Sequence, residues 1–247
     1  MERLDKLLVE KLVFSSRARA EEAIISGKVF VDGQIVTKSG KKISRNAEIS
    51  VSEPDNHYVS RGAFKLLHAL KVFKIDLQQT ICMDLGASTG GFTQVLLENG
   101  CNKVYCVDVG TDQLHELIKN DVRIINLEQT HIKNLSNSQI NEELSGIVID
   151  VSFISLTKVL PYLPTFLSEN GFVIALIKPQ FEVGKQNLNK QGIVKDITLY
   201  PQVIEAIKSA AEINQFSWQG ITDSPIVGGT GNKEFLCFLR KSTGMNI

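Results

Sequence analysis

The sequence has few cysteines and histidines, and their positions exclude several kinds of site. The four cysteines form no CxxC pair and mostly fall in apolar stretches, at positions 82, 101, 106 and 237. We therefore expect reduced core residues of a cytoplasmic protein, and no zinc or other metal site. The last histidine is His131, so the final 116 residues contain none.

Long apolar runs and an excess of charge of either sign are also missing. The longest purely apolar run, residues 172–177, is far shorter than the roughly 20 residues of a membrane span. The first residues, MERLD, show no secretion signal. Lysine plus arginine and aspartate plus glutamate each number 27, and aromatic residues make up only 7% of the chain. Whole-chain charge therefore gives no sign of nucleic-acid binding, and any basic surface must be local.

Residues 1–52 have the pattern of a small separate module. Helical spacing from Leu4 is followed by a second helix, which Ser15-Ser16 should cap and Gly27 should end. Asp32-Gly33 is a strong hairpin signal. The strands expected in this module are 29–31, 35–36 and 48–51. Between residues 11 and 47, eight basic residues face three acidic ones, which gives a local charge of +5.

A polar linker, 53–59, leads to a larger region, 60–241, in which apolar strands alternate with helices, and residues 242–247 are expected to form a loose tail. Strands buried on both sides favour an α/β fold with a doubly wound, mainly parallel sheet. The expected strands are 81–85, 103–108, 122–126, 146–151, 171–177, 216–222 and 234–240. The expected helices are 91–98, 111–119, 156–167, 198–214 and one that Ser60 caps and that runs to Val72.

The most informative segment is the glycine-rich run DLGASTGGFT, residues 84–93, between an expected strand and an expected helix. Such a turn lets a ligand approach the backbone, where the N–H groups of the helix start point at it. The next strand ends in Asp108, 22 positions after Gly86. That is close to the spacing, about 20 residues, at which a carboxylate meets ribose hydroxyls. The segment predicts a site for an adenosine-containing cofactor.

Other interpretations of this turn remain open. Ala87 and Ser88 stand where the dinucleotide fingerprint G-x-G-x-x-G needs its second glycine. An acid two residues before the first glycine instead resembles the first motif of S-adenosylmethionine-dependent methyltransferases. Residues 86–90 also match the hydrolase pattern G-x-S-x-G, but that chemistry needs a histidine late in the chain. A purely structural glycine turn is the remaining alternative.

Four charged residues lie within or at the ends of apolar segments, where a charged side chain requires a structural or functional explanation. Lys65 interrupts an apolar helix, Asp150 and Lys178 each end an apolar strand, and Glu234 opens the last strand. Any one alone is compatible with a solvated charge. The strand ends at 84, 108, 150 and 178 would, however, share the carboxyl edge of the sheet, where ligands bind in such folds.

These residues fall in motifs that resemble the haemolysin-A-like (TlyA) family. The motifs are SRGxxKL at 60–66, the run at 84–93, DVSFISL at 150–156, KPQFE at 178–182 and GNKEFL at 231–236. The segments RLD at 3–5, SRARA at 16–20 and ISGKVFVDG at 25–33 resemble the S4 RNA-binding module. The resemblance implies an S4 module that binds structured RNA through phosphates and shape. It also implies a Rossmann-like methyltransferase domain similar to FtsJ-type RNA 2′-O-methyltransferases, with seven strands, the last one antiparallel.

The resemblance further implies S-adenosyl-L-methionine as cofactor, and methylation of a cytidine 2′-hydroxyl in ribosomal RNA. The catalytic residues would be Lys65, Asp150, Lys178 and Glu234, where a neutral Lys178 takes the hydroxyl proton while the carboxylates orient the two amines. The expected cofactor contacts are Asp84, Gly86, Ala87, Ser88, Gly90, Gly91 and Phe92 around the methionyl part, Asp108 and Val109 at the ribose, Glu128 and Gln129 near the adenine, and Asp150. The expected RNA contacts are Arg3, Arg17, Arg19, Lys28, Lys41, Lys42 and Arg61.

The partners expected from these assignments are ribosomal RNA and ribosomal subunits, with no membrane partner. Two other functions remain open at this point. One is a non-catalytic RNA-binding or ribosome-assembly factor, which the loss of one of the four catalytic residues would have favoured. The other, suggested by the family name, is a membrane-active haemolysin. The sequence departs from the family pattern at His131, where asparagine is expected, and in the linker at Asn56–Val59.

Overall fold

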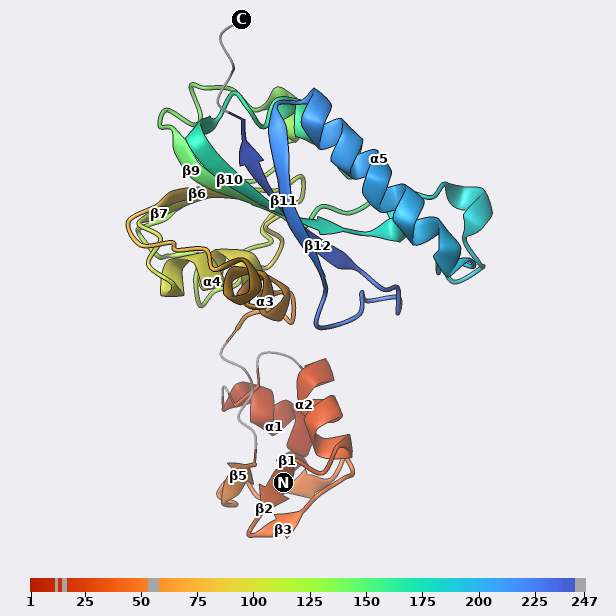
Figure 1. Cartoon of the computed structure of the whole chain (residues 1–247). Coiled ribbons are helices and arrows are strands. Elements are labelled where there is room, and N and C mark those ends of the chain that lie inside the picture. The colour runs from red at the N-terminus through yellow and green to blue at the C-terminus, as the bar shows by residue number, and fades with distance from the viewer. Residues whose placement is uncertain (12, 15–16, 53–57, 243–247) are drawn as a thin grey trace, which may run out of the picture. The chain divides into compact units, whose positions relative to one another are not determined.

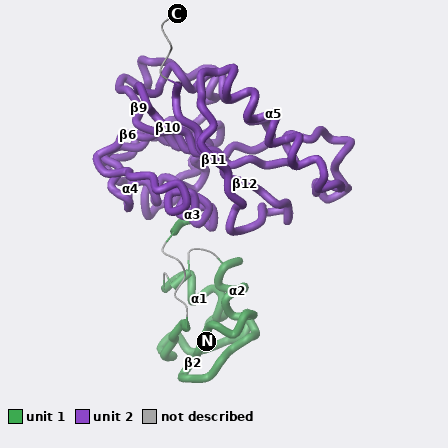
Figure 2. Tube along the Cα trace, viewed as in Figure 1, with its two compact units in different colours: residues 1–59 green, residues 60–247 purple. Residues whose placement is uncertain are grey.

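The computed structural model describes residues 1–11, 13–14, 17–52 and 58–242 (Figure 1). The chain divides into two compact units, residues 1–59 and 60–247 (Figure 2). The predicted serine cap at 15–16, most of the predicted linker and most of the predicted tail fall outside the described residues.

The first unit is a small α+β module with its own apolar core. Helices α1 (Leu4–Glu10) and α2 (Arg17–Ile25) pack against each other. Strand β2 (Val29–Val31) pairs antiparallel with both β3 (Gln34–Ile35) and β5 (Ile49–Val51). Asp32 and Gly33 both have positive φ, 50° and 76°, as a tight hairpin turn requires. The sequence pattern did not predict a second pair, β1 (Glu2–Arg3) with β4 (Lys42–Ile43).

The second unit is built on a seven-stranded sheet with the order β11-β12-β10-β9-β6-β7-β8. Five neighbouring strands run parallel, while β12 is antiparallel to both β10 and β11. The predicted fold class is therefore confirmed, including the antiparallel last strand. The strand bounds are Ile81–Leu85 (β6), Lys103–Val107 (β7), Ile124–Leu127 (β8), Leu144–Ile149 (β9), Leu167–Ile177 (β10), Phe216–Asp223 (β11) and Phe235–Lys241 (β12).

Helices cover both faces of this sheet (Figure 1). One face packs against α5 (Tyr200–Ile213) through Val203, Ile207 and Ala211. The other lies under α3 (Ala63–Phe73) and α4 (Gly91–Glu98). Because successive side chains of a strand point to opposite faces, strands covered on both sides must be apolar throughout. In the part of the chain that the structure describes, no helix has both the length and the apolarity needed to cross a membrane.

Three of the helix predictions were wrong in position or cap. Residues 156–167 form two short 3₁₀ turns, Leu156–Lys158 and Leu160–Tyr162, and β10 already begins at Leu167. Pro161 and Pro164 explain the difference, because proline removes an N–H donor and disfavours helical geometry in the residue before it.

The other two corrections concern residues 111–119 and the cap of α3. Residues 111–115 form bends and irregular backbone and residues 116–119 a turn, and the carboxylate of Glu128 binds the N–H groups of Asp112 and Gln113. Ser60 does not cap a helix: α3 begins at Ala63, its cap residue is Gly62, and no side chain caps it. Ser60 instead packs over the glycine turn, where a Cβ on Gly91 would lie 2.0 Å from its Oγ.

Candidate active site

The glycine turn after β6 is shaped by close contact with the next strand end. Gly86 has a φ of +85°, and a Cβ there would lie 2.8 Å from the carbonyl oxygen of Asp150. Only glycine tolerates both conditions. The N–H of Asp150 in turn donates to the carbonyl of Leu85 at 3.0 Å. The turn and the end of β9 are therefore held together through the backbone.

Asp84 supports this turn from inside the protein. Its side chain is fully buried, and its Oδ2 accepts a 2.7 Å hydrogen bond from the hydroxyl of Thr93 on α4. Burial raises the pKa of Asp84 to about 7, and the nearby carboxylates of Asp150 and Asp108 add to the shift. Asp84 thus links β6 to the start of α4, and it does not line the cavities described below. Gly90 is likewise buried, with a φ of +90°.

Asp108, at the end of β7, connects the turn to the following loop. Its Oδ2 accepts the N–H of Ser88 at 2.8 Å, and its Oδ1 accepts the N–H of Gly110 at 2.7 Å. Each carboxylate oxygen can accept a second hydrogen bond. Asp108 therefore fixes the glycine turn while it keeps acceptor capacity for a ligand.

Three cavities meet at this edge of the sheet, in the region that the structure describes. The turn cavity, about 310 Å³, is lined by Gly86, Ala87, Ser88, Gly91, Phe92, Arg61 and Lys65 among others. The strand-end cavity, about 560 Å³, is lined by Val107, Asp108, Val109, Thr130, His131 and Ile132 among others. The outer cavity, about 850 Å³, is lined by Phe153, Phe181, Lys185, Leu188, Gln191 and Glu234 among others. Asp150 and Ser152 line all three, and Lys178 lines the turn cavity and the outer cavity.

The four predicted catalytic residues lie together around the outer cavity as two ion pairs. The Nζ of Lys65 lies 2.7 Å from Oε2 of Glu234, and the Nζ of Lys178 lies 2.6 Å from Oδ1 of Asp150. The side chains of Lys65 and Glu234 are 10% and 3% exposed. Such an arrangement holds two amines in fixed positions beside a space open to a substrate.

The predicted adenine contacts do not line the strand-end cavity. Glu128 binds the N–H groups of Asp112 and Gln113, and Gln129 reaches the hydroxyl of Thr111 at 3.1 Å. The wall there is formed by the three residues that follow, Thr130, His131 and Ile132. Glu128 and Gln129 thus stand just before this wall in the sequence, and their contact with adenine stays a prediction.

Sequence reasoning missed Ser152 and the aromatic pair beside it. The hydroxyl of Ser152 accepts a 2.8 Å hydrogen bond from the Nζ of Lys178. Phe153 has a φ of +64°, is 91% exposed and contacts Phe181 with ring centroids 5.1 Å apart. Both aromatic residues line the outer cavity and lie within the motifs at 150–156 and 178–182. The sequence signal that could have pointed to these residues is a phenylalanine in each of the two polar motifs that follow a strand.

The wall of the outer cavity is held by a buried asparagine. The amide nitrogen of Asn232 donates to the carbonyl of Gly192 at 3.0 Å, and its oxygen accepts the N–H of Val194 at 3.0 Å. Asn232 is 1% exposed and stands two residues before Glu234. The loop 184–194 is thereby tied to the start of β12.

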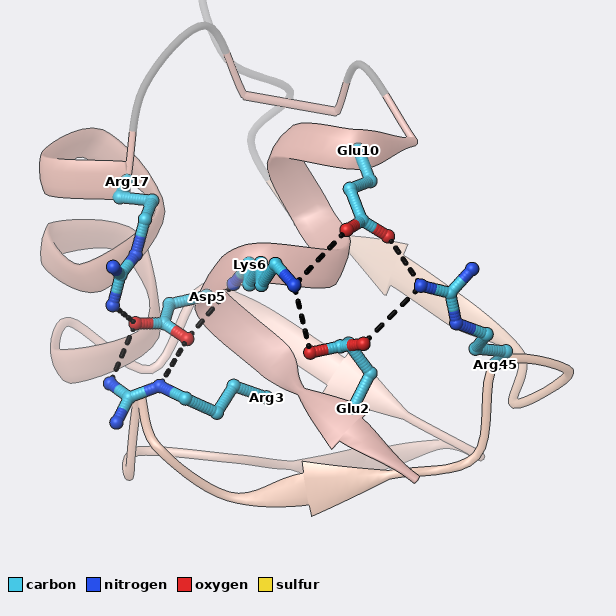
Figure 3. Close-up of polar contacts among 7 residues, drawn as sticks. All are labelled: Glu2, Arg3, Asp5, Lys6, Glu10, Arg17 and Arg45. Atoms are coloured by element: carbon cyan, nitrogen blue, oxygen red, sulfur yellow. Dashed lines mark hydrogen bonds and ion pairs between the residues drawn. The ribbon is translucent and has the colours of Figure 1, made fainter.

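The basic residues predicted to bind RNA in the first unit differ in their surroundings. Arg3 and Arg17 both bind the buried carboxylate of Asp5, with shortest distances of 2.8 and 2.7 Å (Figure 3), and these bonds hold the pKa of Asp5 well below its usual range. Arg19 donates to the carbonyl of Tyr58 at 3.0 Å. Lys41 and Lys42 are exposed, and Lys28 is half-buried. In the second unit Arg61 is exposed at the turn cavity.

Comparisons with known proteins identify both units. Residues 58–241 match the FtsJ-like methyltransferase model, and residues 2–49 match the S4 domain model. The 16S/23S rRNA (cytidine-2′-O)-methyltransferase TlyA of Mycobacterium tuberculosis is 38% identical over 98% of this chain and 90% of its own length. The chain belongs to the TlyA family. The resemblance to this family noted from the motifs is therefore confirmed.

Further TlyA-family relatives carry a different name. Hemolysin A of Brachyspira hyodysenteriae is 38% identical over 95% of this chain and 98% of its own length. A solved structure described as a "putative hemolysin" from Streptococcus thermophilus is 40% identical, with a TM-score of 0.78, over 98% of this chain and 89% of that one. The second unit is thus a methyltransferase domain and the first an S4 domain.

Proposed function

We propose that this protein transfers a methyl group from S-adenosyl-L-methionine to the 2′-hydroxyl of a cytidine in ribosomal RNA. The observation that carries the proposal is the position of Lys178, paired with Asp150 where the turn cavity and the outer cavity meet. A basic group at this junction can reach a substrate hydroxyl in the outer cavity and face a methyl donor in the turn cavity. The names of the TlyA relatives support ribosomal RNA as the substrate.

The residues present fit S-adenosylmethionine. The glycine turn offers backbone to the methionyl part, with Gly86, Ala87, Ser88, Gly91 and Phe92 on the wall of the turn cavity. Asp108 retains acceptor capacity for ribose hydroxyls, and Val109 beside it is 69% exposed. Thr130, His131 and Ile132 offer a mixed polar and apolar wall for the adenine. The bound cofactor would supply an electrophilic methyl group on a sulfonium.

The protein's own groups would then prepare the hydroxyl. A ribose hydroxyl is a poor nucleophile and must lose its proton as it attacks. In its neutral form Lys178 takes that proton at Nζ, while Asp150 orients the amine. Lys65, held by Glu234, lines the same cavity as Lys178 and gives the site a second amine in a fixed position. The position of Lys178 at the junction of the two cavities contributes to catalysis alongside the basicity of its amine.

The S4 domain would hold the RNA. Its exposed Lys41 and Lys42, together with Arg3, Arg17, Arg19 and Lys28, supply phosphate contacts, and Arg61 extends them at the methyltransferase domain. We assign the S4 domain to residues 1–52, a linker to 53–59, the methyltransferase domain to 60–241 and a tail to 242–247. The ribosome is the partner in this proposal, and the cytoplasm is its place of action.

Incubation of the protein with methyl-labelled S-adenosylmethionine and purified ribosomal subunits tests the proposal. We expect label in the RNA, located at a cytidine 2′-oxygen by its resistance to alkaline cleavage. Lys178→Ala should abolish labelling and leave cofactor affinity close to that of the parent, whereas Lys71→Ala, an exposed lysine on α3 that lines none of the three cavities, should have no effect.

The same experiment separates the rival functions. RNA binding without labelling would identify a ribosome-assembly factor. Release of a dye from lipid vesicles by the purified protein, without labelling, would identify a haemolysin. Labelling by Lys178→Ala at the parent rate would remove Lys178 from its role while leaving the activity in place.

A further inference from the structure

The hydroxyl of Ser152 is the second acceptor that the Nζ of Lys178 contacts. The Nζ of Lys178 lies 2.6 Å from Oδ1 of Asp150 and donates to Oγ of Ser152 at 2.8 Å. We propose that Ser152 is a positioning residue for Lys178, and that it aims the free electron pair of the neutral amine at the substrate hydroxyl. The inference rests on the proposed function, in which Lys178 accepts the proton of that hydroxyl.

The geometry of a neutral amine gives Ser152 this role. An uncharged Nζ carries two hydrogens and one electron pair, arranged tetrahedrally with the Cε bond. Ser152 accepts one of the hydrogens, whereas Oδ1 of Asp150 lies close to Nζ as an ion-pair partner without the geometry of a hydrogen bond. With Asp150 alone, rotation about the Cδ–Cε and Cε–Nζ bonds leaves several directions open to the electron pair. The directional bond to Ser152 therefore raises the fraction of time in which the electron pair is correctly placed.

Ser152 is itself held in place through the neighbouring loop. Glu182, four residues after Lys178, accepts the hydroxyl of Ser155 at 2.6 Å and the N–H of Leu156 at 2.8 Å. These two bonds tie the segment that follows β9 to the segment that follows β10. The segments that carry Ser152 and Lys178 are thus joined to each other a few residues beyond these two side chains.

The direction of the hydrogen bond between Ser152 and Lys178 decides whether removal of the hydroxyl lowers or raises the rate of methyl transfer. If Ser152 accepts from the amine, its removal frees the amine to rotate and slows proton transfer. If Ser152 instead donated its O–H to the electron pair of neutral Lys178, it would compete with the substrate. Its removal would then leave the rate unchanged or raise it. Ser152 lines the outer cavity and is exposed, so its substitution leaves the core intact.

The test compares Ser152→Ala and Ser152→Thr with the parent under single-turnover conditions on ribosomal subunits. Ser138→Ala, which removes an exposed hydroxyl bonded only locally to Ser136 within the described part of the chain, is the matched control. We expect Ser152→Ala to lower kcat roughly two- to tenfold, the equivalent of one net hydrogen bond. Because Ser152 also lines the turn and strand-end cavities, the comparison is made at saturating cofactor. Ser152→Thr, which keeps the hydroxyl, should recover most of the activity.

A spectroscopic measurement keeps the inference separate from the proposed function. Nuclear magnetic resonance of lysine side chains follows the motion of the Cε–Nζ bond of Lys178 without any turnover. This bond should become more mobile in Ser152→Ala and stay restricted in Ser152→Thr and Ser138→Ala. Equal mobility in all variants, an unchanged or higher kcat in Ser152→Ala, or equal reductions in the Ala and Thr variants would each overturn the role of the hydroxyl. Failure of the parent to methylate RNA would instead count against the proposed function.

Discussion

The Nζ of Lys65 and the Oε2 of Glu234 lie 2.7 Å apart although 169 residues separate them in the sequence. Lys65 lies on α3, which packs on one face of the sheet, and Glu234 stands just before β12. Both side chains are nearly buried. The pair therefore joins the helix to the sheet at the rim of the outer cavity.

Glu234→Gln should destabilise the methyltransferase domain because it leaves the ammonium of Lys65 buried without a carboxylate. Removal of one partner of a buried pair costs about 3–5 kcal/mol of unfolding free energy. Denaturant unfolding measures this cost, and Lys65→Met combined with Glu234→Gln should recover part of it. Asp223→Asn, which breaks the exposed pair of Asp223 with Lys233, is the control and should cost less than ~1 kcal/mol. Equal effects of the two carboxylate variants would contradict the buried pair.

Asp108→Ala should weaken the binding of S-adenosylmethionine. The substitution removes charge-assisted hydrogen bonds worth ~1.5–3 kcal/mol, which corresponds to a roughly 10- to 150-fold higher Kd. It also frees the N–H groups of Ser88 and Gly110, which loosens the glycine turn. Isothermal titration calorimetry checks the change, with Asp112→Ala on the adjoining exposed loop as the control. An unchanged affinity would remove Asp108 from the ribose contact.

Asp84→Asn should change how stability depends on pH. The pKa of Asp84 is about 7 in the folded protein, above the ordinary aspartate value of 3.8, so the folded state holds this proton more tightly than the unfolded state. Stability is then lost as pH rises from about 4 to about 7, at most ~1.4 kcal/mol per pH unit from this group. Asparagine carries no charge and can still accept from Thr93, so the unfolding free energy of the variant should decline less over this range. Parallel pH profiles of the parent and the variant would show that Asp84 titrates as an ordinary aspartate.

Lys41→Ala combined with Lys42→Ala should weaken RNA binding, because two positive charges no longer face phosphates. The slope of log affinity against log salt should become shallower by roughly 0.7–0.9 for each phosphate that is no longer neutralised. Because both lysines are exposed, stability should not change. Titration of RNA at several salt concentrations measures the slope, and Lys133→Ala combined with Lys208→Ala is the control. Parallel slopes with equal affinities would mean that these lysines are only solvated surface.

Arg17→Ala should act differently, because Arg17 also neutralises Asp5. We expect the stability of the S4 domain to fall by about 1 kcal/mol, since the guanidinium is half-exposed and Arg3 still binds the carboxylate. Thermal unfolding of the full chain measures this decrease. A fall in RNA affinity with unchanged stability would show instead that the pair with Asp5 contributes little.

The strands and the glycine turn could be predicted because their signals are local. A strand covered on both faces must be apolar at every position, so β6, β7, β9 and β10 stand out in the sequence. The turn at Gly86 needs a positive φ, which glycine adopts at no steric cost. Local signals also argued against the predicted helix at 156–167, since Pro161 and Pro164 lie inside it. The apolar periodicity there reflected burial against the sheet rather than helix geometry.

What the sequence by itself determined was the order of the elements and the residue types gathered at one edge of the sheet. The tertiary structure decided which of them meet: Lys65 with Glu234, Lys178 with Asp150 and Ser152, and Arg3 and Arg17 with Asp5. It also brings Thr130, His131 and Ile132, rather than Glu128 and Gln129, to the wall of the strand-end cavity. The physical reason is the range of the interactions. Backbone preference and burial pattern depend on neighbours in the sequence. An ion pair or a hydrogen bond depends on distances of a few ångströms, which only the packed chain sets.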